Sequence, residues 1–246
     1  MASSRRMRLR VFAGPNGSGK STITQIIKKK FDLGVYVNAD EIKKLLQDER
    51  QIDFEQFHIV INRDCFVSLF RESPLSKRAD VEKTLEAIDI HDNILYQKEG
   101  TEVEDYFVSF IASYIRNSLL ETSQKFTFET VMSHPSKLEE MRLAKDHGYK
   151  VYLYFVTLAS PQLNKLRVQT RVSQGGHDVD GTKIEERYYR TMDLLFDAVK
   201  LADNAYLFDN SFGEHKLIAQ KENGKMSVLV EYVPEWFQTY LIDKLD

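Results

Sequence analysis

Cysteine and long hydrophobic runs are almost absent from this chain of 246 residues, which contains a single cysteine, Cys65. A lone thiol forms no internal disulfide, so the sequence excludes a disulfide-stapled scaffold and suits a reducing compartment. No stretch approaches the roughly 20 consecutive apolar residues that a membrane-spanning helix needs. Because Cys65 lies in an apolar helical pattern, we expect its side chain in the core.

The chain also lacks a strong bias toward one sign of charge. Its formal net charge of -3 argues against broad nucleic-acid binding driven by phosphate neutralisation, although a local basic pocket for one nucleotide stays compatible with it. The first ten residues are basic, but the apolar run after them is too short for an export signal. We therefore expect a soluble, cytoplasmic protein whose partner is a small molecule rather than a membrane or a nucleic acid.

Short apolar runs alternate with helical patterns along much of the sequence. The expected strands cover residues 8–13, 35–38, 126–129, 150–158 and 205–208. This alternation predicts an α/β fold with an open parallel sheet of about five strands and helices on both faces. Ligands of such sheets lie at the carboxyl ends of the strands.

Two regions depart from the alternation. Residues 52–125 show helical patterns only, so we expect a helical insertion within a single domain that spans residues 1–246. Residues 214–246 should form a C-terminal hairpin, with its turn at Asn223-Gly224, and then a helix.

Two helix starts can be predicted from capping residues. Ser160 and Pro161 suit the N-cap and the first position of one helix. Thr182 and Glu185 have the spacing of a capping box at the start of the next helix.

The segment GPNGSGKS follows the first expected strand directly and precedes a helical pattern. Its fixed positions, Gly14, Gly19, Lys20 and Ser21, match the phosphate-binding P-loop. Glycines let consecutive backbone N–H groups point at phosphate, and the following helix presents its positive end to the same charge. The alternative, a glycine turn with a chance lysine, fits the strand and helix context less well. The fold class is then that of P-loop NTPases and kinases.

Each part of this loop has an expected role. Lys20 should reach the β- and γ-phosphates of the nucleotide, and the Ser21 hydroxyl should hold Mg²⁺. ATP is favoured over GTP because the chain has no Asn-Lys-x-Asp guanine-binding motif. The expected nucleotide-binding residues are Gly14, Pro15, Asn16, Gly17, Ser18, Gly19, Lys20, Ser21 and Thr22.

Acidic residues follow three of the expected strands. Asp40 comes just after the second strand, where a carboxylate can accept the proton of a substrate hydroxyl as the hydroxyl attacks the γ-phosphate. The alternative is that Asp40 only caps the next helix. Glu129 ends the third strand and could bind the hydrated Mg²⁺ or a substrate hydroxyl, or could instead pair with an arginine. For Asp209 and Asn210 a turn or a cap is the favoured interpretation.

Four arginines are candidates for stabilising the charge on the transferred phosphoryl group. Arg167 and Arg171 lie four apart on one expected helix, and Arg187 and Arg190 lie on the next. The segment between these helices, SQGGHDVDG, is expected to form a mobile lid, with His177 as a loop residue. A solvated helix face is the alternative for each arginine.

The motifs occur in a characteristic order: GPNGSGKST, NADEI, FTFETVMSH, GYKVYLYFVTL, RVSQGGHDV with a following RYYR, and YLFDNS. In this order they resemble the zeta toxin family of P-loop kinases, over residues 8–43 and 125–211. The resemblance implies an ATP-dependent kinase that phosphorylates the 3'-hydroxyl of the sugar in UDP-N-acetylglucosamine. It also implies that any antitoxin is a separate protein, because no fused antitoxin is recognisable.

The same resemblance implies roles for particular residues. Lys20 corresponds to the family's P-loop lysine, Asp40 to its general base, Glu129 to its substrate-binding glutamate, and Arg171 to a lid arginine. Thr130 follows the glutamate as the family pattern allows. The expected substrate-binding residues are Asp40, Glu129, Thr130, Arg167 and Arg187.

Two other functions remain open on the sequence alone. The acceptor could be another hydroxyl, on a different metabolite, an antibiotic or a nucleic-acid end. The chain could instead be a nucleotide-binding regulator that uses ATP hydrolysis as a switch. Replacement of Asp40 by asparagine distinguishes them, because a kinase should lose transfer while keeping ATP binding.

Overall fold

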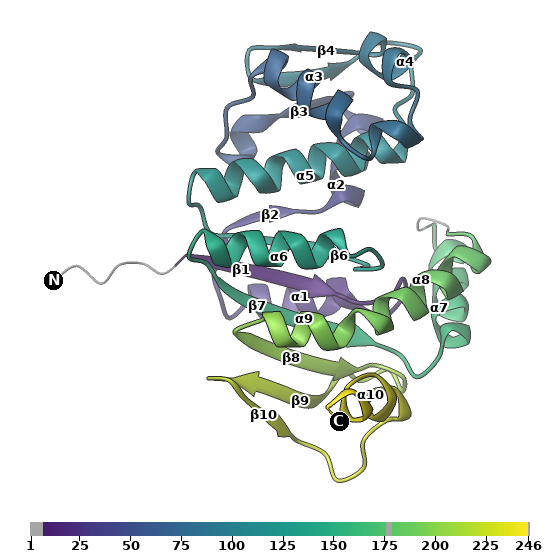
Figure 1. Ribbon diagram of the computed structural model, residues 1–246. Helices are drawn as coiled ribbons and strands as arrows, with labels where there is room; N and C mark the ends of the chain where they lie inside the picture. Colours follow the sequence, from purple (N-terminus) through teal and green to yellow (C-terminus); the bar gives the residue numbers. More distant parts are fainter. Residues whose placement is uncertain (1–6, 176–178, 246) are drawn as a thin grey trace, which may run out of the picture. The chain divides into compact units, whose positions relative to one another are not determined.

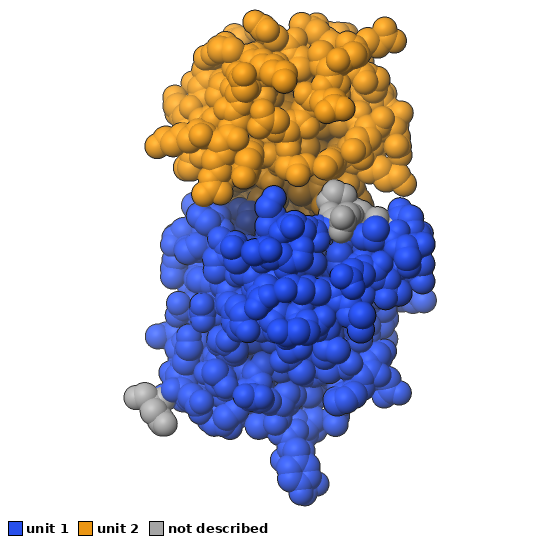
Figure 2. All heavy atoms as spheres, turned by 90° about the vertical axis from the view of Figure 1, so that its right-hand side faces the viewer, with its two compact units in different colours: residues 1–33, 127–246 blue, residues 34–126 orange. Residues whose placement is uncertain are grey.

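The computed structural model describes residues 7–175 and 179–245 and divides the chain into two compact units (Figure 2). The first unit contains residues 1–33 and 127–246, and the second contains residues 34–126. The predicted insertion falls in the second unit. Within the described residues, no helix combines the length and the apolar character that crossing a bilayer requires.

The first unit is a mixed sheet with helices packed against it (Figure 1). Its strands lie in the order β10-β9-β8-β7-β1-β6. The strands are β1 (Arg8–Ala13), β6 (Phe126–Thr130, starting at the unit boundary), β7 (Lys150–Thr157), β8 (Asn204–Asp209), β9 (Lys216–Glu222) and β10 (Lys225–Val228). The helices are α1 (Lys20–Lys28), α6 (Ser136–Asp146), α7 (Pro161–Ser173), α8 (Gly181–Asp193), α9 (Leu195–Leu201), α10 (Glu235–Tyr240) and the 3₁₀ turn η3 (Ile242–Lys244).

The predicted α/β class is confirmed, with one difference in the sheet. Strands β1, β7 and β8 run parallel, as the alternating sequence pattern predicts. The predicted C-terminal hairpin also forms, but its strands β9 and β10 extend the same sheet in the antiparallel direction. Asn223 and Gly224 at its turn both have positive φ, of 50° and 77°, as a tight hairpin turn requires.

The sheet of the first unit is buried on both faces. On one face Phe12 of β1 stacks on Tyr154 of β7, with ring centroids 4.7 Å apart, and Ile23 of α1 joins this cluster. The alternate residue Phe155 faces the other way and contacts Trp236 of α10. Because successive side chains of a strand point to opposite faces, the apolar run of β7 reflects burial on both sides.

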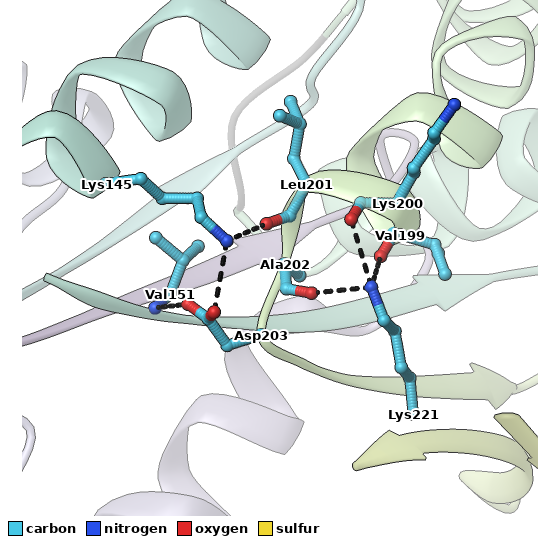
Figure 3. Close-up of polar contacts among 8 residues, drawn as sticks. All are labelled: Lys145, Val151, Val199, Lys200, Leu201, Ala202, Asp203 and Lys221. Atoms are coloured by element: carbon cyan, nitrogen blue, oxygen red, sulfur yellow. Dashed lines mark hydrogen bonds and ion pairs between the residues drawn. The ribbon is translucent and has the colours of Figure 1, made fainter. Parts of the chain in front are cut away.

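Lys221 of β9 holds the carboxyl end of helix α9 (Figure 3). Its ammonium group donates to the carbonyl oxygens of Val199, Lys200 and Ala202 at 2.9, 3.0 and 2.8 Å. These are carbonyls that the end of a helix leaves without an intrahelical partner. Burial lowers the pKa of Lys221, and the nearby charge of Lys145 acts in the same direction.

Asp203 occupies the turn from α9 into β8 and joins two further elements there (Figure 3). Its carboxylate accepts from the backbone N–H of Val151 at 2.8 Å and from the ammonium of Lys145 at 3.0 Å. Lys145 also donates to the carbonyl of Leu201 at 3.0 Å. Burial acts to raise the pKa of Asp203, but the hydrogen bonds from Val151 and Lys145 outweigh it, so the pKa lies below its ordinary value.

The second unit is built around one long buried helix, α5 (Asp105–Glu121). Its other helices and 3₁₀ turns are α2 (Ala39–Asp48), η1 (Phe54–Phe57), α3 (Arg63–Glu72), η2 (Ser76–Arg78) and α4 (Val81–Glu86). Its strands are β2 (Val35–Val37), β3 (Gln51–Asp53), β4 (Ile88–His91) and β5 (Ile94–Gln97).

The expectation of helices alone over residues 52–125 is corrected by a small antiparallel sheet in the order β3-β5-β4. Strands β4 and β5 form a hairpin whose turn residues, Asp92 and Asn93, both have positive φ. In β4, Ile88 and Ile90 are buried while the residues after each are exposed. Such alternation marks a half-buried strand, but this strand is too short to stand out from the surrounding helical patterns.

Aromatic packing forms the core of the second unit. Phe66 of α3 contacts Phe107, Phe110 and Tyr114 of α5, with ring centroids 6.0, 5.0 and 4.9 Å apart. The expectation that Cys65 is buried is wrong, because its side chain is exposed. Phe66 next to it takes the inward position on α3.

Candidate active site

The P-loop motif lies between β1 and α1, the strand–loop–helix context that the sequence predicts. Helix α1 begins at Lys20 and has Gly19 as its N-cap. The Lys20 ammonium donates to the carbonyls of Gly14 and Pro15 at 2.8 and 3.0 Å, which holds it over the start of the loop. In loops of this kind the backbone N–H groups at the start of the helix and the lysine ammonium bind the same phosphate groups.

At two glycines of the loop an added Cβ would clash with neighbouring atoms, of the backbone at Gly14 and of side chains at Gly19. Gly14 has φ of 142°, and a Cβ on it would lie 1.9 Å from the carbonyl oxygen of Val156 on β7. Gly19 has φ of 97°, and a Cβ there would lie 2.5 Å from Asn210 Nδ2 and 2.7 Å from His215 Nε2. The loop is thus packed tightly against its surroundings at both ends.

Glu129 at the end of β6 faces the first turns of α1. Its two carboxylate oxygens accept hydrogen bonds from Ser21 Oγ at 3.1 Å and from Thr24 Oγ1 at 2.6 Å. The Glu129 carboxylate is therefore hydrogen-bonded to two hydroxyl groups and, within the described residues, is not paired with an arginine. The structure brings together Lys20, Ser21 and Glu129, three of the predicted site residues.

A magnesium ion suits this group of oxygen atoms. Within the described residues, no cluster of three or more His, Cys, Asp or Glu side chains could hold a metal by itself. Mg²⁺ usually keeps several waters and takes one or two protein oxygens together with substrate phosphates. Ser21 Oγ and Glu129 Oε2, 3.1 Å apart beside the P-loop, fit that kind of site.

Two asparagines hold the carbonyl oxygens of the P-loop from outside. Asn164 of α7 donates from Nδ2 to the carbonyl of Asn16 at 2.6 Å. Asn210, directly after β8, donates from Nδ2 to the carbonyl of Ser18 at 2.8 Å. Both side chains are buried, with 0% and 2% of their surface exposed. The prediction of a turn or cap role for Asn210 therefore missed its contact with the loop.

A histidine and an arginine complete this arrangement. His215 Nε2 lies 3.1 Å from the carbonyl oxygen of Gly19 and 3.1 Å from Asn210 Nδ2. With the proton on Nε2 the ring donates to the Gly19 carbonyl, and with the proton on Nδ1 it accepts from the Asn210 amide. Arg167 of α7 donates from Nη2 to the carbonyl of Asn210 at 2.5 Å. We call Asn164, Asn210 and His215 the carbonyl clamp. Sequence reasoning missed it, although the YLFDNS motif already contained Asn210.

The other predicted arginines lie on α7 and α8, helices that are joined by an ion pair between Lys165 and Glu185 at 2.5 Å. Arg171 is exposed near the end of α7, and Arg187 is half-buried on α8. Arg190 Nε donates to the carbonyl of Glu186 on its own helix. Of the predicted lid, residues 176–178, including His177, lie outside the described residues.

Thr130 and Tyr188 have local structural contacts. The Thr130 hydroxyl accepts from the backbone N–H of Met132 at 2.9 Å, where the backbone of Met132 has a φ of 58°. Tyr188, in the RYYR segment, donates to the carbonyl of Leu158 at 3.0 Å, which anchors α8 at the end of β7. Burial raises the pKa of Tyr188 far above its ordinary value, so the phenol stays protonated and can donate.

Asp40 belongs to the second unit, where it lies in the first turn of α2 with an exposed side chain. The cap of this helix is Asn38, whose side-chain oxygen accepts from the backbone N–H of Asp40 at 2.9 Å. The alternative that Asp40 serves as the helix cap is therefore wrong.

Asp209 is tied to the only tryptophan of the sequence. Its carboxylate accepts from Trp236 Nε1 at 2.6 Å and from the backbone N–H of Ser211 at 2.7 Å. Both Asp209 and Trp236 are buried. The turn after β8, which carries Asn210, is thus fixed from two sides.

Comparison with known structures identifies the class of fold. The chain resembles a structure of the PezAT chromosomal toxin–antitoxin system of Streptococcus pneumoniae, with a TM-score of 0.50 and 14% identity over 89% of this chain and 72% of that one. It also resembles the AvrRxo1-ORF1:ORF2 complex solved with ATP, with a TM-score of 0.54 and 16% identity over 92% of this chain and 62% of that one. The chain therefore shares the fold of these two structures, in agreement with the fold that the sequence resemblance implied.

The native AvrRxo1-ORF1:ORF2 complex gives the same result, with a TM-score of 0.54 and 17% identity over 96% of this chain and 64% of that one. This chain thus spans less than two thirds of the AvrRxo1 chain. No family model matches the sequence. A curated relative, an uncharacterized protein of Haemophilus influenzae, is 30% identical over 63 residues, which cover 26% of this chain and 45% of that protein.

Proposed function

We propose that the protein is an ATP-dependent small-molecule kinase of the zeta toxin type, which transfers the γ-phosphate to the 3'-hydroxyl of the sugar in UDP-N-acetylglucosamine. The observation that carries the proposal is the P-loop with Lys20 over it and the Ser21–Glu129 pair beside it. Among similar structures, AvrRxo1-ORF1:ORF2 was solved with ATP, which supports the choice of nucleotide. The choice of UDP-N-acetylglucosamine as the acceptor rests on the resemblance of the sequence motifs.

In this mechanism the P-loop amides and Lys20 bind the β- and γ-phosphates. Bound at Ser21 and Glu129, Mg²⁺ would neutralise charge on the phosphate oxygens. Asp40 accepts the proton of the sugar hydroxyl, and the hydroxyl oxygen forms a bond to the γ-phosphorus while the bond to the ADP oxygen breaks. The products are ADP, a sugar phosphate and a protonated Asp40, which returns its proton to water.

The remaining predicted residues act on the substrate in this proposal. Arg171 stabilises the charge that spreads over the transferred phosphoryl oxygens, with Arg167 and Arg187 as substrate-binding residues. Thr130 contributes its hydroxyl next to Glu129. All four assignments rest on the sequence.

We also propose that a separate antitoxin protein controls the enzyme in the cytoplasm. PezAT is a toxin–antitoxin system, and AvrRxo1-ORF1 was solved together with ORF2. Coexpression of the chain with the product of a neighbouring reading frame, followed by copurification, tests this partner. Growth arrest without that product and normal growth with it are the expected results.

The test of function is transfer of phosphate from ATP to UDP-N-acetylglucosamine by the purified protein with Mg²⁺, followed by mass spectrometry. A product from the wild type, and none from Lys20→Ala or Asp40→Asn, is expected. The Asp40→Asn variant should bind ATP normally, while its rate falls about 10²–10⁴-fold.

Each other outcome has a definite meaning. ATP binding without a sugar phosphate would refute the acceptor and direct the search to other hydroxyl compounds. Acceptor-independent ATP hydrolysis that Lys20→Ala abolishes and Asp40→Asn leaves intact would instead identify a regulatory ATPase.

A further inference from the structure

We propose that the carbonyl clamp, Asn164, Asn210 and His215, positions the P-loop for phosphate binding by holding its carbonyl oxygens outward. These are positioning residues, since they act through the loop backbone. The proposal rests on the proposed function only in taking ATP as the ligand of the loop.

The physical reason lies in the geometry of the peptide unit. Because the unit is planar and trans, its N–H and C=O groups point in opposite directions. A loop that turns its N–H groups toward phosphate must turn the corresponding carbonyls away, and buried carbonyls need donors there. Asn164, Asn210 and His215 contact the carbonyls of Asn16, Ser18 and Gly19 at 2.6–3.1 Å, whereas Lys20 of the loop itself donates to those of Gly14 and Pro15.

The three side chains come from two separate segments of the fold, helix α7 and the connection between β8 and β9. Asn164 lies on α7, Asn210 follows β8, and His215 precedes β9. They converge on one short loop although they are 148 to 196 residues away from their partners in sequence. Such convergence from two distant segments is more than a local turn would require.

In the two buried asparagines the amide N–H groups, and not the side-chain oxygens, make the hydrogen bonds to the P-loop. The side-chain oxygens of Asn164 and Asn210 have no hydrogen-bond partner within the described residues, although both are buried. An unsatisfied buried oxygen costs about 1–3 kcal/mol. An apolar side chain of similar size would avoid that cost, so the amide N–H groups are what these positions retain.

Arg167 links two parts of the clamp. It lies three residues after Asn164 on α7 and donates to the carbonyl of Asn210 at 2.5 Å. Asn164 and Asn210 are therefore held in a fixed relation to each other. A shift of α7 would be transmitted to the P-loop through both Asn164 and Arg167.

The first test replaces Asn210 by aspartate, which keeps the shape but places a carboxylate oxygen against the Ser18 carbonyl. Asn204→Asp is the matched control, since Asn204 is also buried but lies at the other end of β8. Isothermal titration with ATP should show a loss of affinity of about tenfold or more for Asn210→Asp, by the strength of one buried hydrogen bond. Asn204→Asp should bind as the wild type does.

The second test uses His215 and separates positioning from folding. Glutamine can place its amide N–H near the position of Nε2, whereas methionine fills the space without a donor. His215→Gln should keep most of the ATP affinity and His215→Met should lose it, while thermal unfolding shows similar stability for both. A merely structural histidine would give equal ATP affinity in the two variants.

The proposal is overturned if folded Asn210→Asp and His215→Met bind ATP as tightly as the wild type. It is also overturned if Asn204→Asp weakens ATP binding as much as Asn210→Asp does, because the effect would then be general. If the wild type itself binds no ATP, the proposed function fails first, so the two failures are distinct.

Discussion

The two units differ in the kind of residue that they bury. In the second unit the core is aromatic, and the described buried polar residues are Ser76, Thr84 and Arg116. The first unit buries a larger set of polar side chains: Arg10, Ser18, Thr24, Thr127, Thr157, Asn164, Thr191, Asn204, Asp209 and Asn210.

This difference indicates where folding has been constrained by function. Buried polar groups lower stability unless they are hydrogen-bonded, so they persist where a site needs them. Four of those in the first unit, Ser18, Thr24, Asn164 and Asn210, lie in the P-loop, in the first turns of α1 or in contact with the loop. Among the charged residues of the second unit are exposed ion pairs such as Arg71–Glu82.

The aromatic core of the second unit gives the largest expected effect on stability. Phe66→Ala should lower the free energy of unfolding by about 3–5 kcal/mol, because removal of the ring leaves a cavity among the aromatic side chains that contact it. Urea unfolding followed by circular dichroism measures it, since Trp236 reports on the first unit only. Val60→Ala is the control, because Val60 is 84% exposed. A change below about 1 kcal/mol for Phe66→Ala would contradict an aromatic core.

In the first unit, Glu129→Gln should lower the rate of phosphate transfer more than it lowers stability. Gln keeps the shape but loses the negative charge that faces Ser21 and Thr24, so we expect transfer to fall by about 10²-fold and to need more Mg²⁺. Initial rates measured against Mg²⁺ concentration check this. Glu139→Gln, on the exposed face of α6, should leave both quantities unchanged. An unaltered Mg²⁺ requirement in Glu129→Gln would remove Glu129 from the metal site.

A smaller, pH-dependent effect is expected at Asp203. Its pKa in the folded protein is below the ordinary value of 3.8, so its contribution to stability is present above about pH 4 and is lost as the pH falls through the folded pKa. Asp203→Asn should therefore lower the melting temperature more at pH 7 than at pH 3. Thermal unfolding across this range checks it, with the exposed Asp64→Asn as the control. An equal difference at both pH values would refute the linkage.

The sequence predicted the parts of the fold that depend on local patterns. The P-loop, the apolar strand β7, the Asn223-Gly224 hairpin and the Ser160 N-cap all depend on residues close together in the chain. The second capping assignment was wrong, because Asp180 caps α8 by accepting from the backbone N–H groups of Thr182 and Lys183. The N-cap of α8 is therefore Asp180, directly before Gly181, and not the expected Thr182.

What the sequence could not predict depends on tertiary packing. His215 and Asn164 carry no signal of their own, because their partners in the P-loop lie far away in the sequence. The outward position of Cys65 follows from the rotation of α3, which turns Phe66 into the aromatic cluster. The sequence patterns did not predict the β4–β5 hairpin. Asp92-Asn93 is a turn signal, but the strands beside it are short and lie between segments with helical periodicity.

The bond between Trp236 and Asp209 gives the protein an optical probe of its own. The indole is buried and donates to the residue next to Asn210, whose amide binds the P-loop. Since the chain has one tryptophan, its tryptophan emission, excited selectively over that of tyrosine, comes from this single place. Nucleotide titrations can then be followed by emission intensity on unlabelled protein, with Trp236 recording small movements at the end of β8.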